Sequence, residues 1–301
     1  MPNSSRNTAA LSRMACTGEV FEAARAGTGR NRAQPLEAHG LDHCLPAQRD
    51  LRALLAYAFC MRDDGATEGP ASWDVSILSA YTITMSPRFS ETVLITDAPD
   101  NVTGRLLGLP GLRLRKCCGG DTFVMRHLPT GADLVVTAKP SGQISTREHR
   151  SWRPITMDEP LTAHERSELA DVPHMSNDAK RLLGGIFCRI STSDPAGKWA
   201  IGNWFYDPIR VFVDGPEERS RTLSGIGDAW ELRWGPYPYA DDLAASLTSQ
   251  QIGLADAYAT TGDNHLVLGL GKATIRLYGK IRPLIDRRST SAQSDSVGGA
   301  R

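Results

Sequence analysis

Trp230-Glu231-Leu232-Arg233-Trp234 is the stretch of sequence that decides the fold. Its apolar residues alternate with charged ones, which is the pattern of a β-strand with one buried face and one solvent face. The stretch lies in residues 199–239, a window that holds nine of the twenty aromatic residues of the 301-residue chain. Because aromatic rings bring a large apolar area and a specific packing geometry, this aromatic block predicts either the centre of a core or a stacking surface.

The segment 202–207 carries the most specific pattern of the aromatic block. In a strand, Asn203 would lie between apolar neighbours on its own face, and a buried amide needs hydrogen-bond partners. Aromatic rings beside one amide and one carboxylate suit a ligand such as a nucleobase or a sugar ring. The same residues equally suit an ordinary corner of a core in which the amide is bonded internally. The candidate ligand-binding residues are Asn203, Trp204, Tyr206 and Asp207, and no metal site is predicted.

Secondary structure on either side of the aromatic block is predicted from apolar spacing, caps and turns. Helices are expected at residues 46–61, 99–107, 162–170, 176–187 and 239–247. Strands are expected at residues 73–85, 92–95, 112–117, 122–128, 133–137, 265–269 and 273–279. Most connections between strands are too short for the crossovers of a parallel sheet. This predicts an α+β fold of mixed, largely antiparallel sheets with flanking helices, and no internal repeat is apparent.

Composition divides the chain into five segments. Residues 1–45 are expected to be a flexible basic N-terminal segment and residues 284–301 a flexible tail, because neither has a sustained apolar period. Between them we expect a helix plus β-rich subdomain at 46–140, a linker at 141–160, and an α+β subdomain with the aromatic block at 161–283. Disordered basic tails either contact a nucleic-acid backbone weakly or simply keep the ends solvated.

A short helix is expected after Thr17, which can act as its N-cap. Around this position, Arg13-Met14, Thr17-Gly18-Glu19, Phe21 and Ala23 resemble a short segment at the start of many uncharacterised actinobacterial proteins, some of which are carried on mobile elements. The resemblance covers this segment alone. It implies a bacterial origin, and it implies no particular activity.

Cysteine usage and hydropathy predict a soluble cytoplasmic protein without a membrane partner. The six cysteines show no paired spacing, which is typical of reduced thiols. No apolar run approaches the roughly 18 residues that a membrane helix needs. The first 30 residues also lack the apolar region of a secretory signal.

Asp97 and Asp100 are the candidate catalytic residues. They lie where a predicted strand gives way to a helix, which is a common place for ligands and catalytic acids. The alternative is that they cap the helix and bond the turn. Asp100 after a proline, with Asp133 and Lys139 downstream, resembles the pattern of the PD-(D/E)xK nucleases. The pattern requires an acidic residue two positions before the lysine, and Thr137 stands there.

Other enzyme motifs fail at chemically necessary positions. A phosphate-loop pattern around residues 266–273 has Leu266 in place of its first glycine and Ala273 in place of the hydroxyl residue that would meet magnesium. The sequence therefore favours a soluble bacterial binding or regulatory protein of unknown ligand and unknown cofactor. The alternative is an enzyme acting on nucleic acid or nucleotides. Convergence of Asp97 and Asp100 with Asn203 and Asp207 would favour the enzyme.

Overall fold

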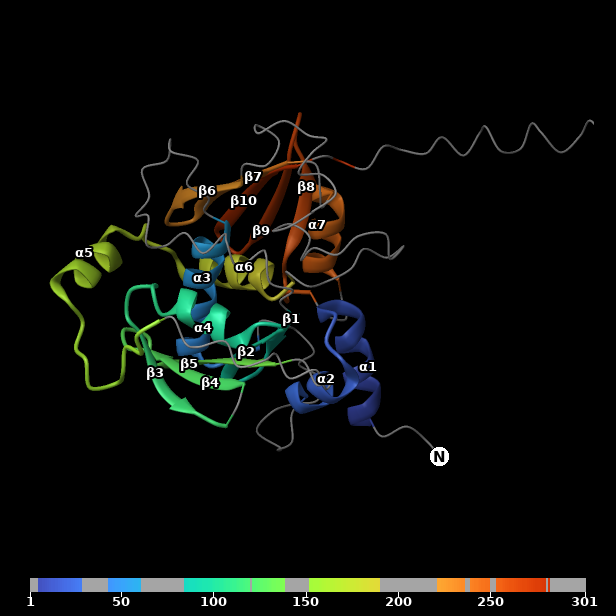
Figure 1. Ribbon diagram of the computed structural model, residues 1–301. Helices are drawn as coiled ribbons and strands as arrows, with labels where there is room; N and C mark the ends of the chain where they lie inside the picture. The colour runs from blue at the N-terminus through green and yellow to red at the C-terminus, as the bar shows by residue number, and fades with distance from the viewer. Residues whose placement is uncertain are drawn as a thin grey trace, which may run out of the picture.

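Two mixed β-sheets enclose helices in the computed structural model, which describes residues 5–28, 43–60, 84–119, 121–138, 152–189, 221–235, 239–249, 253–279 and 281 (Figure 1). The helices are α1 (Ser5–Thr17), α2 (Phe21–Gly27), α3 (Pro46–Cys60), α4 (Pro99–Leu106), α5 (Ala163–Asp171), α6 (Asn177–Phe187) and α7 (Ala240–Thr248). The strands are β1 (Thr84–Pro87), β2 (Glu91–Thr96), β3 (Leu112–Cys117), β4 (Thr122–His127), β5 (Ala132–Ala138), β6 (Arg221–Ile226), β7 (Ala229–Trp234), β8 (Tyr258–Thr261), β9 (Leu266–Leu270) and β10 (Ala273–Tyr278). The predicted α+β class with mixed, largely antiparallel sheets is confirmed.

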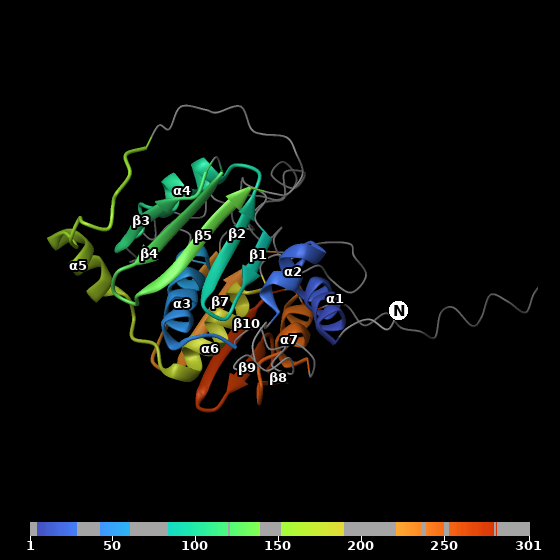
Figure 2. The same cartoon turned by 90° about the horizontal axis from the view of Figure 1, so that it is seen from below.

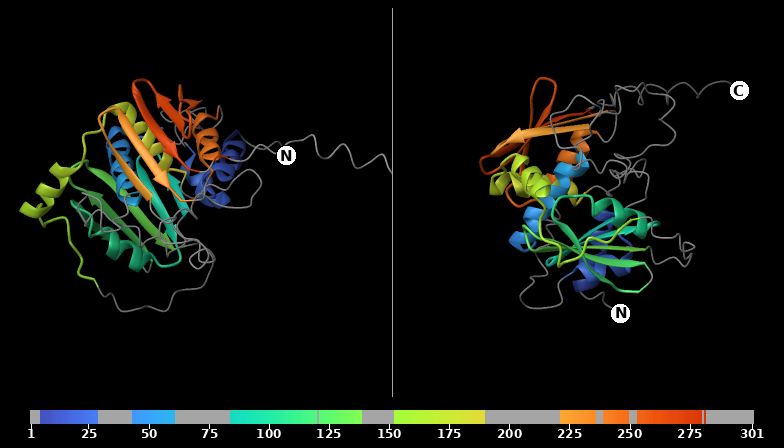
Figure 3. Two further views of the ribbon diagram at one scale, coloured as in Figure 1. Left: turned by 90° about the horizontal axis from the view of Figure 1, so that it is seen from above. Right: turned by 60° about the vertical axis from the view of Figure 1, so that its left-hand side comes forward.

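Both sheets have the same strand order and the same strand directions. The first runs β1-β2-β5-β4-β3 and the second β6-β7-β10-β9-β8. In each, one parallel pair, β2–β5 or β7–β10, lies among antiparallel pairs. A helix precedes each sheet, and another follows its second strand. The unit helix-strand-strand-helix-strand-strand-strand therefore occurs twice, from α3 to β5 and from α6 to β10 (Figure 2, Figure 3).

The helices that open the two units also share sequence. When residues 50–60 are aligned with residues 178–188, five of eleven positions are identical. The shared residues are an aspartate, two adjacent leucines, and a final Phe-Cys pair. The strands that follow do not preserve such identity, as ETVLIT in β2 and AWELRW in β7 show. This is why the repeat is not apparent from the sequence and becomes clear only from the topology.

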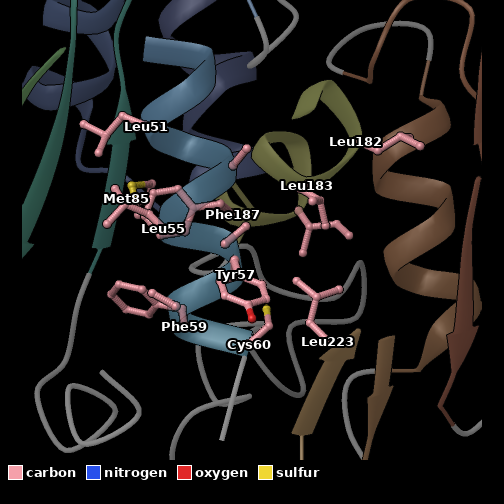
Figure 4. Packing of buried hydrophobic residues seen from close by; sticks show 14 of the residues in the cluster. Leu51, Leu55, Tyr57, Phe59, Cys60, Met85, Leu182, Leu183, Phe187 and Leu223 are labelled. Atoms are coloured by element: carbon pink, nitrogen blue, oxygen red, sulfur yellow. The ribbon is translucent and has the colours of Figure 1, made fainter. Parts of the chain in front are cut away.

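Helices α3 and α6 cross at the centre of the molecule and join the two units (Figure 4). The equivalent rings of Phe59 and Phe187 meet edge to face, with 5.4 Å between their centroids. A Cβ atom on Gly184 would lie 3.3 Å from the Cβ of Arg52, so glycine there allows a close approach of the two helices. Lys180 also forms an ion pair of 2.9 Å with Asp50. One hydrophobic core thus runs through both predicted subdomains.

The inner face of each sheet packs on its own pair of helices. In the second sheet, Trp230, Leu232 and Trp234 are all buried, as are Ala273, Ile275 and Leu277 of the neighbouring strand. The strand predicted from the alternation in residues 230–234 is therefore confirmed, in the predicted register. Helices α6 and α7 lie against this face, as α3 and α4 lie against the first sheet (Figure 1).

The N-terminal segment is more ordered over residues 5–28 than its composition predicts. Arg13 on α1 donates to Glu19 across the turn, with 2.7 Å between Nε and Oε2. Thr17 donates to the same carboxylate oxygen at 2.6 Å, and Arg13 also donates to the Pro87 carbonyl oxygen of β1. A short helix does follow Thr17, but Val20 rather than Thr17 is its N-cap, and Thr17 instead ends α1, a helix that was not predicted. A buried ion pair explains order that apolar spacing alone does not indicate.

Other differences concern short edge strands and the aromatic block. β6 and β8 were not among the predicted strands, because neither has a long apolar or β-branched run. An aromatic cluster is not found within the part of the chain that the structure describes. Residues 190–220 and 236–238, which carry most of the block, lie outside that part, as do residues 73–83 of one predicted strand.

Candidate functional site

The residues predicted from sequence to form a site are only partly described. Asn203, Trp204, Tyr206 and Asp207 lie outside the described residues, so their grouping stays a prediction. Asp97 is exposed after β2, and Asp100 lies in the first turn of α4. Whether all four polar residues converge therefore stays open.

Asp100 has a structural partner. Its Oδ2 accepts a hydrogen bond of 3.1 Å from Nε1 of Trp152. The Trp152 ring in turn contacts the Phe123 ring edge to face, with centroids 6.1 Å apart. Within the described residues, no group of three or more His, Cys, Asp or Glu side chains could hold a metal ion. Through this hydrogen bond, Asp100 helps to hold Trp152 and the segment that follows it against the first unit.

A buried polar network surrounds Arg52 on α3. Its Nε donates to the Thr92 hydroxyl at 3.0 Å, and its Nη2 donates to the Arg88 carbonyl oxygen. Gln48 accepts from the Thr92 hydroxyl at 2.9 Å and donates to the Asp133 carbonyl oxygen at 2.7 Å. Since these donors meet backbone and hydroxyl oxygens of β2 and β5, the network fastens α3 to the sheet.

A second buried network surrounds Arg113 on β3. Its guanidinium donates to both oxygens of Glu165, at 2.7 and 2.8 Å. Glu165 also completes a capping box with Thr162 at the start of α5 and accepts from the Gly111 N–H. The hydrogen bond from Arg113 is the main cause that lowers the pKa of Glu165 to about 2. This arrangement holds a carboxylate permanently charged, which suits anchoring rather than acid-base catalysis.

His127 lies beside the Arg113 network and is held neutral. Burial is the main cause that lowers its pKa to about 4. Its Nε2 lies 3.2 Å from the Pro110 carbonyl oxygen, which can only accept, so this nitrogen carries the proton. Its Nδ1 then accepts from the Thr130 hydroxyl at 3.0 Å. Both ring nitrogens are occupied by the fold.

We predict a loss of stability as the pH falls from about 6.5, the ordinary histidine pKa, towards about 4. In this window the unfolded chain binds a proton at His127 and the folded chain does not, so protons favour unfolding. The contribution of this residue to the slope approaches about 1.4 kcal/mol per pH unit. Urea unfolding between pH 7 and 4 measures it. His127→Gln, which does not titrate there, should show a flatter dependence, and an unchanged slope would contradict the assignment.

The outer face of the second sheet carries an exposed ionic network, as does the first sheet, where Asp133 pairs with Arg115 at 2.9 Å and with Arg126 at 2.7 Å. The network of the second sheet is defined here by Glu231 and Arg233 of β7 and Arg276 and Tyr278 of β10. Glu231 accepts from Arg233 at 2.9 Å and from Arg276 at 3.0 Å. The side chains of Arg233 and Arg276 are 53% and 56% exposed. Hydrogen bonds from Arg233, foremost, and from Arg276 lower the pKa of Glu231.

Aromatic rings support these charges on the same face. The guanidinium carbon of Arg233 lies 3.8 Å from the centre of the Tyr278 ring, a cation–π distance. The ring of His265 also lies against the Tyr278 ring, with centroids 5.1 Å apart. Arg233 is therefore positioned rather than freely extended, which reduces the entropy lost when it binds a ligand.

The equivalent positions in the first sheet are apolar and covered. The strand registers make Val93 the counterpart of Glu231 and Ile95 the counterpart of Arg233. Val93 is 2% exposed and Ile95 is 6% exposed. Helices α1 and α2 pack against β1 at this side of the first sheet (Figure 2). The two units thus differ at these two positions, which are apolar and buried on β2 but charged and at the surface on β7.

The open face can bind an anion. Guanidinium groups present paired N–H donors that match the geometry of carboxylate and phosphate groups. Glu231 satisfies both arginines when nothing is bound and would compete with an incoming anion. The sequence alternation indicated that Glu231 and Arg233 are exposed. It gave no sign that Arg276 from a distant strand would join them.

Comparison with known proteins gives no relative from which a function can be transferred. No helix in the described ranges combines the length and the apolar character required to cross a membrane. No protein-family model, no curated protein and no solved structure matches the chain.

Proposed function

We propose that this chain is a non-catalytic binding or regulatory protein that recognises an anionic ligand with the outer face of its second sheet. The observation that carries the proposal is the exposed network of Arg233, Glu231 and Arg276, since the positions in the first unit that match Glu231 and Arg233 are apolar and buried. The shared chemistry of its ligands is a phosphate or carboxylate group.

The buried ionic groups support a binding role over a catalytic one. Arg52 donates to the Thr92 hydroxyl and to a backbone oxygen, and Arg113 donates to a backbone oxygen and to the Glu165 carboxylate. His127 has both nitrogens engaged by Pro110 and Thr130. A general base must be within reach of a substrate proton and have a pKa near the working pH, and neither His127 nor Glu165 meets both conditions.

We also propose that the protein is bacterial, that it is carried on a mobile element, and that it is located in the cytoplasm. The first two rest on the N-terminal resemblance around Arg13 and Glu19. The location rests on cysteine usage, since the six cysteines of the sequence show no paired spacing.

The alternative function is an enzyme acting on nucleic acid or nucleotides. It would use Asp97 and Asp100 together with Asn203 and Asp207. The bond between Asp100 and Trp152 gives that aspartate a structural task and so weighs against the alternative. Contact of the basic tails with nucleic acid remains part of this alternative, although Arg6 and Arg13 are bonded within the α1–α2 segment.

Thermal-shift measurements with pyrophosphate, adenine nucleotides and dicarboxylates test the proposal. A ligand that binds only the folded chain raises the melting temperature in proportion to ln(1 + [L]/Kd). We expect at least one anion to stabilise the protein, and Arg233→Ala/Arg276→Ala to abolish the shift. Glu231→Gln should enlarge it, because the internal competitor is gone.

The matched control is Arg153→Ala, which removes an exposed arginine, paired with Glu159, from the segment between the two units. It should leave the ligand-induced shift unchanged. Equal shifts in the wild type and in the double variant would contradict the proposal. A shift that appears only with a divalent metal and disappears in Asp97→Asn/Asp100→Asn would favour the enzyme instead.

A further inference from the structure

Strand β8 forms an edge of the second sheet that no other strand of the described residues covers. β9 is its only strand neighbour in the described part of the chain. All four of its residues, Tyr258-Ala259-Thr260-Thr261, are exposed, and none is charged. Edge strands expose backbone N–H and C=O groups that pair readily with another chain, and proteins usually block them with charge, a bulge or a covering segment.

The equivalent strand of the first unit has all three protections. β3 occupies the same place in its sheet as β8, and it carries Arg113, Arg115 and Lys116. Its register with β4 shifts between Leu114 and Lys116, which marks a bulge. An extended segment also covers its free edge, because the Leu114 N–H donates to the Ile155 carbonyl oxygen at 2.7 Å and Leu114 bridges Thr156 in parallel.

The cover of β3 therefore shows which kind of segment can pair with an edge strand at this place in the fold. The cover of β3 is a short extended segment running parallel to the strand, bonded through its backbone. β8 has neither the charges nor the bulge that would exclude such a segment. Its hydroxyl and aromatic side chains also resemble those that pack well beside a neighbouring strand.

Tyr258 adds a side-chain surface to this edge. A Cβ on Gly269 would lie 2.2 Å from Cζ of Tyr258, so the tyrosine ring lies directly over that glycine of β9. Glycine leaves room for the ring, which is fixed across the strand pair and remains 46% exposed. An incoming strand would place one of its side chains beside this ring.

We propose that β8 binds an extended peptide segment of a partner protein as an additional parallel strand. The backbone of the segment would supply the affinity. An aromatic or β-branched side chain against Tyr258 would supply the specificity, as in other cases of strand addition. This inference goes beyond the proposed anion site, since β8 lies at the sheet edge while Arg233 and Arg276 lie on β7 and β10.

Selection from a displayed library of random seven-residue peptides, using the full chain as target, tests the proposal. We expect enriched peptides to be rich in Val, Ile, Thr and aromatic residues and poor in proline. Synthetic copies are then titrated against the wild type and against Ala259→Pro and Thr260→Pro. Because consecutive N–H groups of a strand point to opposite sides, one proline removes a bond to β9 and the other removes an outward donor.

The melting temperature shows which of the two proline variants has lost a hydrogen bond to β9 and which has lost only an outward donor. The proline that leaves the melting temperature near that of the wild type should weaken peptide binding at least tenfold. Failure to enrich any peptide, or equal binding to that variant and to the wild type, would overturn the proposal. So would a dimer of the chain that dissociates in the same variant, since a second copy would then occupy the edge. Binding that requires removal of residues 282–301 would likewise assign the edge to the chain's own C-terminal segment.

The result for peptide binding is independent of the result for anion binding. Arg233→Ala/Arg276→Ala should leave peptide binding unchanged, and the informative proline variant should keep its anion-induced thermal shift. Each proposal can therefore fail while the other stands.

Discussion

Trp230→Ala is expected to lower the free energy of unfolding by about 3–5 kcal/mol. Trp230 is 1% exposed and lies on the inner face of β7, opposite Ile275 of β10. Its Nε1 donates to the Gly227 carbonyl oxygen at 3.1 Å, so the substitution opens a cavity and also removes this hydrogen bond. Equilibrium urea unfolding followed by far-ultraviolet circular dichroism measures the loss.

Glu231→Ala is the matched control for this strand. It removes the neighbouring residue, whose side chain points to solvent and pairs only with exposed arginines. Exposed ion pairs contribute between zero and about 1 kcal/mol, so this variant should unfold at nearly the wild-type urea concentration. Losses of equal size at positions 230 and 231 would show that the register of β7 is wrong.

Arg113→Ala is expected to cost about 3–5 kcal/mol, because it removes a buried guanidinium that pairs with the half-buried Glu165 carboxylate. Arg113 is 1% exposed and also donates to the Glu159 carbonyl oxygen at 2.9 Å and the Pro160 carbonyl oxygen at 3.1 Å. Without it, Glu165 loses the main cause of its lowered pKa, and the segment before α5 loses its anchor. Chemical unfolding at pH 7 gives the magnitude.

Acid titration of the wild type checks the same pair. Because the folded-state pKa of Glu165 lies at about 2, below its ordinary value of 4.5, its contribution is complete above pH 4.5 and is lost as the pH falls towards 2. Arg113→Met/Glu165→Gln leaves no charge unpaired and should be more stable than Arg113→Met alone. If the double variant is the less stable of the two, Arg113 acts by packing rather than by pairing.

Local patterns predicted the central elements of the fold. The alternation in β7 and β10 and the helical stripe of α6 depend on neighbouring residues only, and the structure confirms them. The capping box of Thr162 and Glu165 likewise begins α5 where predicted. The sequence predicts these features because buried residues recur with the period of the helix or strand that contains them.

Long-range features could not be predicted in the same way. The ion pair of Arg13 and Glu19 orders α1 and α2 although their composition resembles that of a flexible tail. β8 owes its place to pairing with β9, since its own four residues are all exposed. The repeated unit is visible as a strand order, while the sequence preserves it in α3 and α6 alone.

The candidate site could not be predicted from local patterns either. Sequence reasoning indicated exposure of Glu231 and Arg233, yet their significance depends on Arg276, which the parallel pairing of β7 and β10 brings beside them. It also depends on comparison with Val93 and Ile95, which requires the two registers. The residues predicted instead, Asn203, Trp204, Tyr206 and Asp207, lie outside the described residues.

Amide chemical-shift mapping with pyrophosphate tests the central claim most directly, namely that ligands bind the outer face of the second sheet. Titration of the isotope-labelled chain should shift the amides of Glu231, Arg233, Arg276 and Tyr278 most strongly. Glu231→Gln should reach the same end point at a lower pyrophosphate concentration. Shifts centred on Asp97 and Asp100, or no shift at β7 and β10 for any anion that stabilises the protein, would contradict the claim.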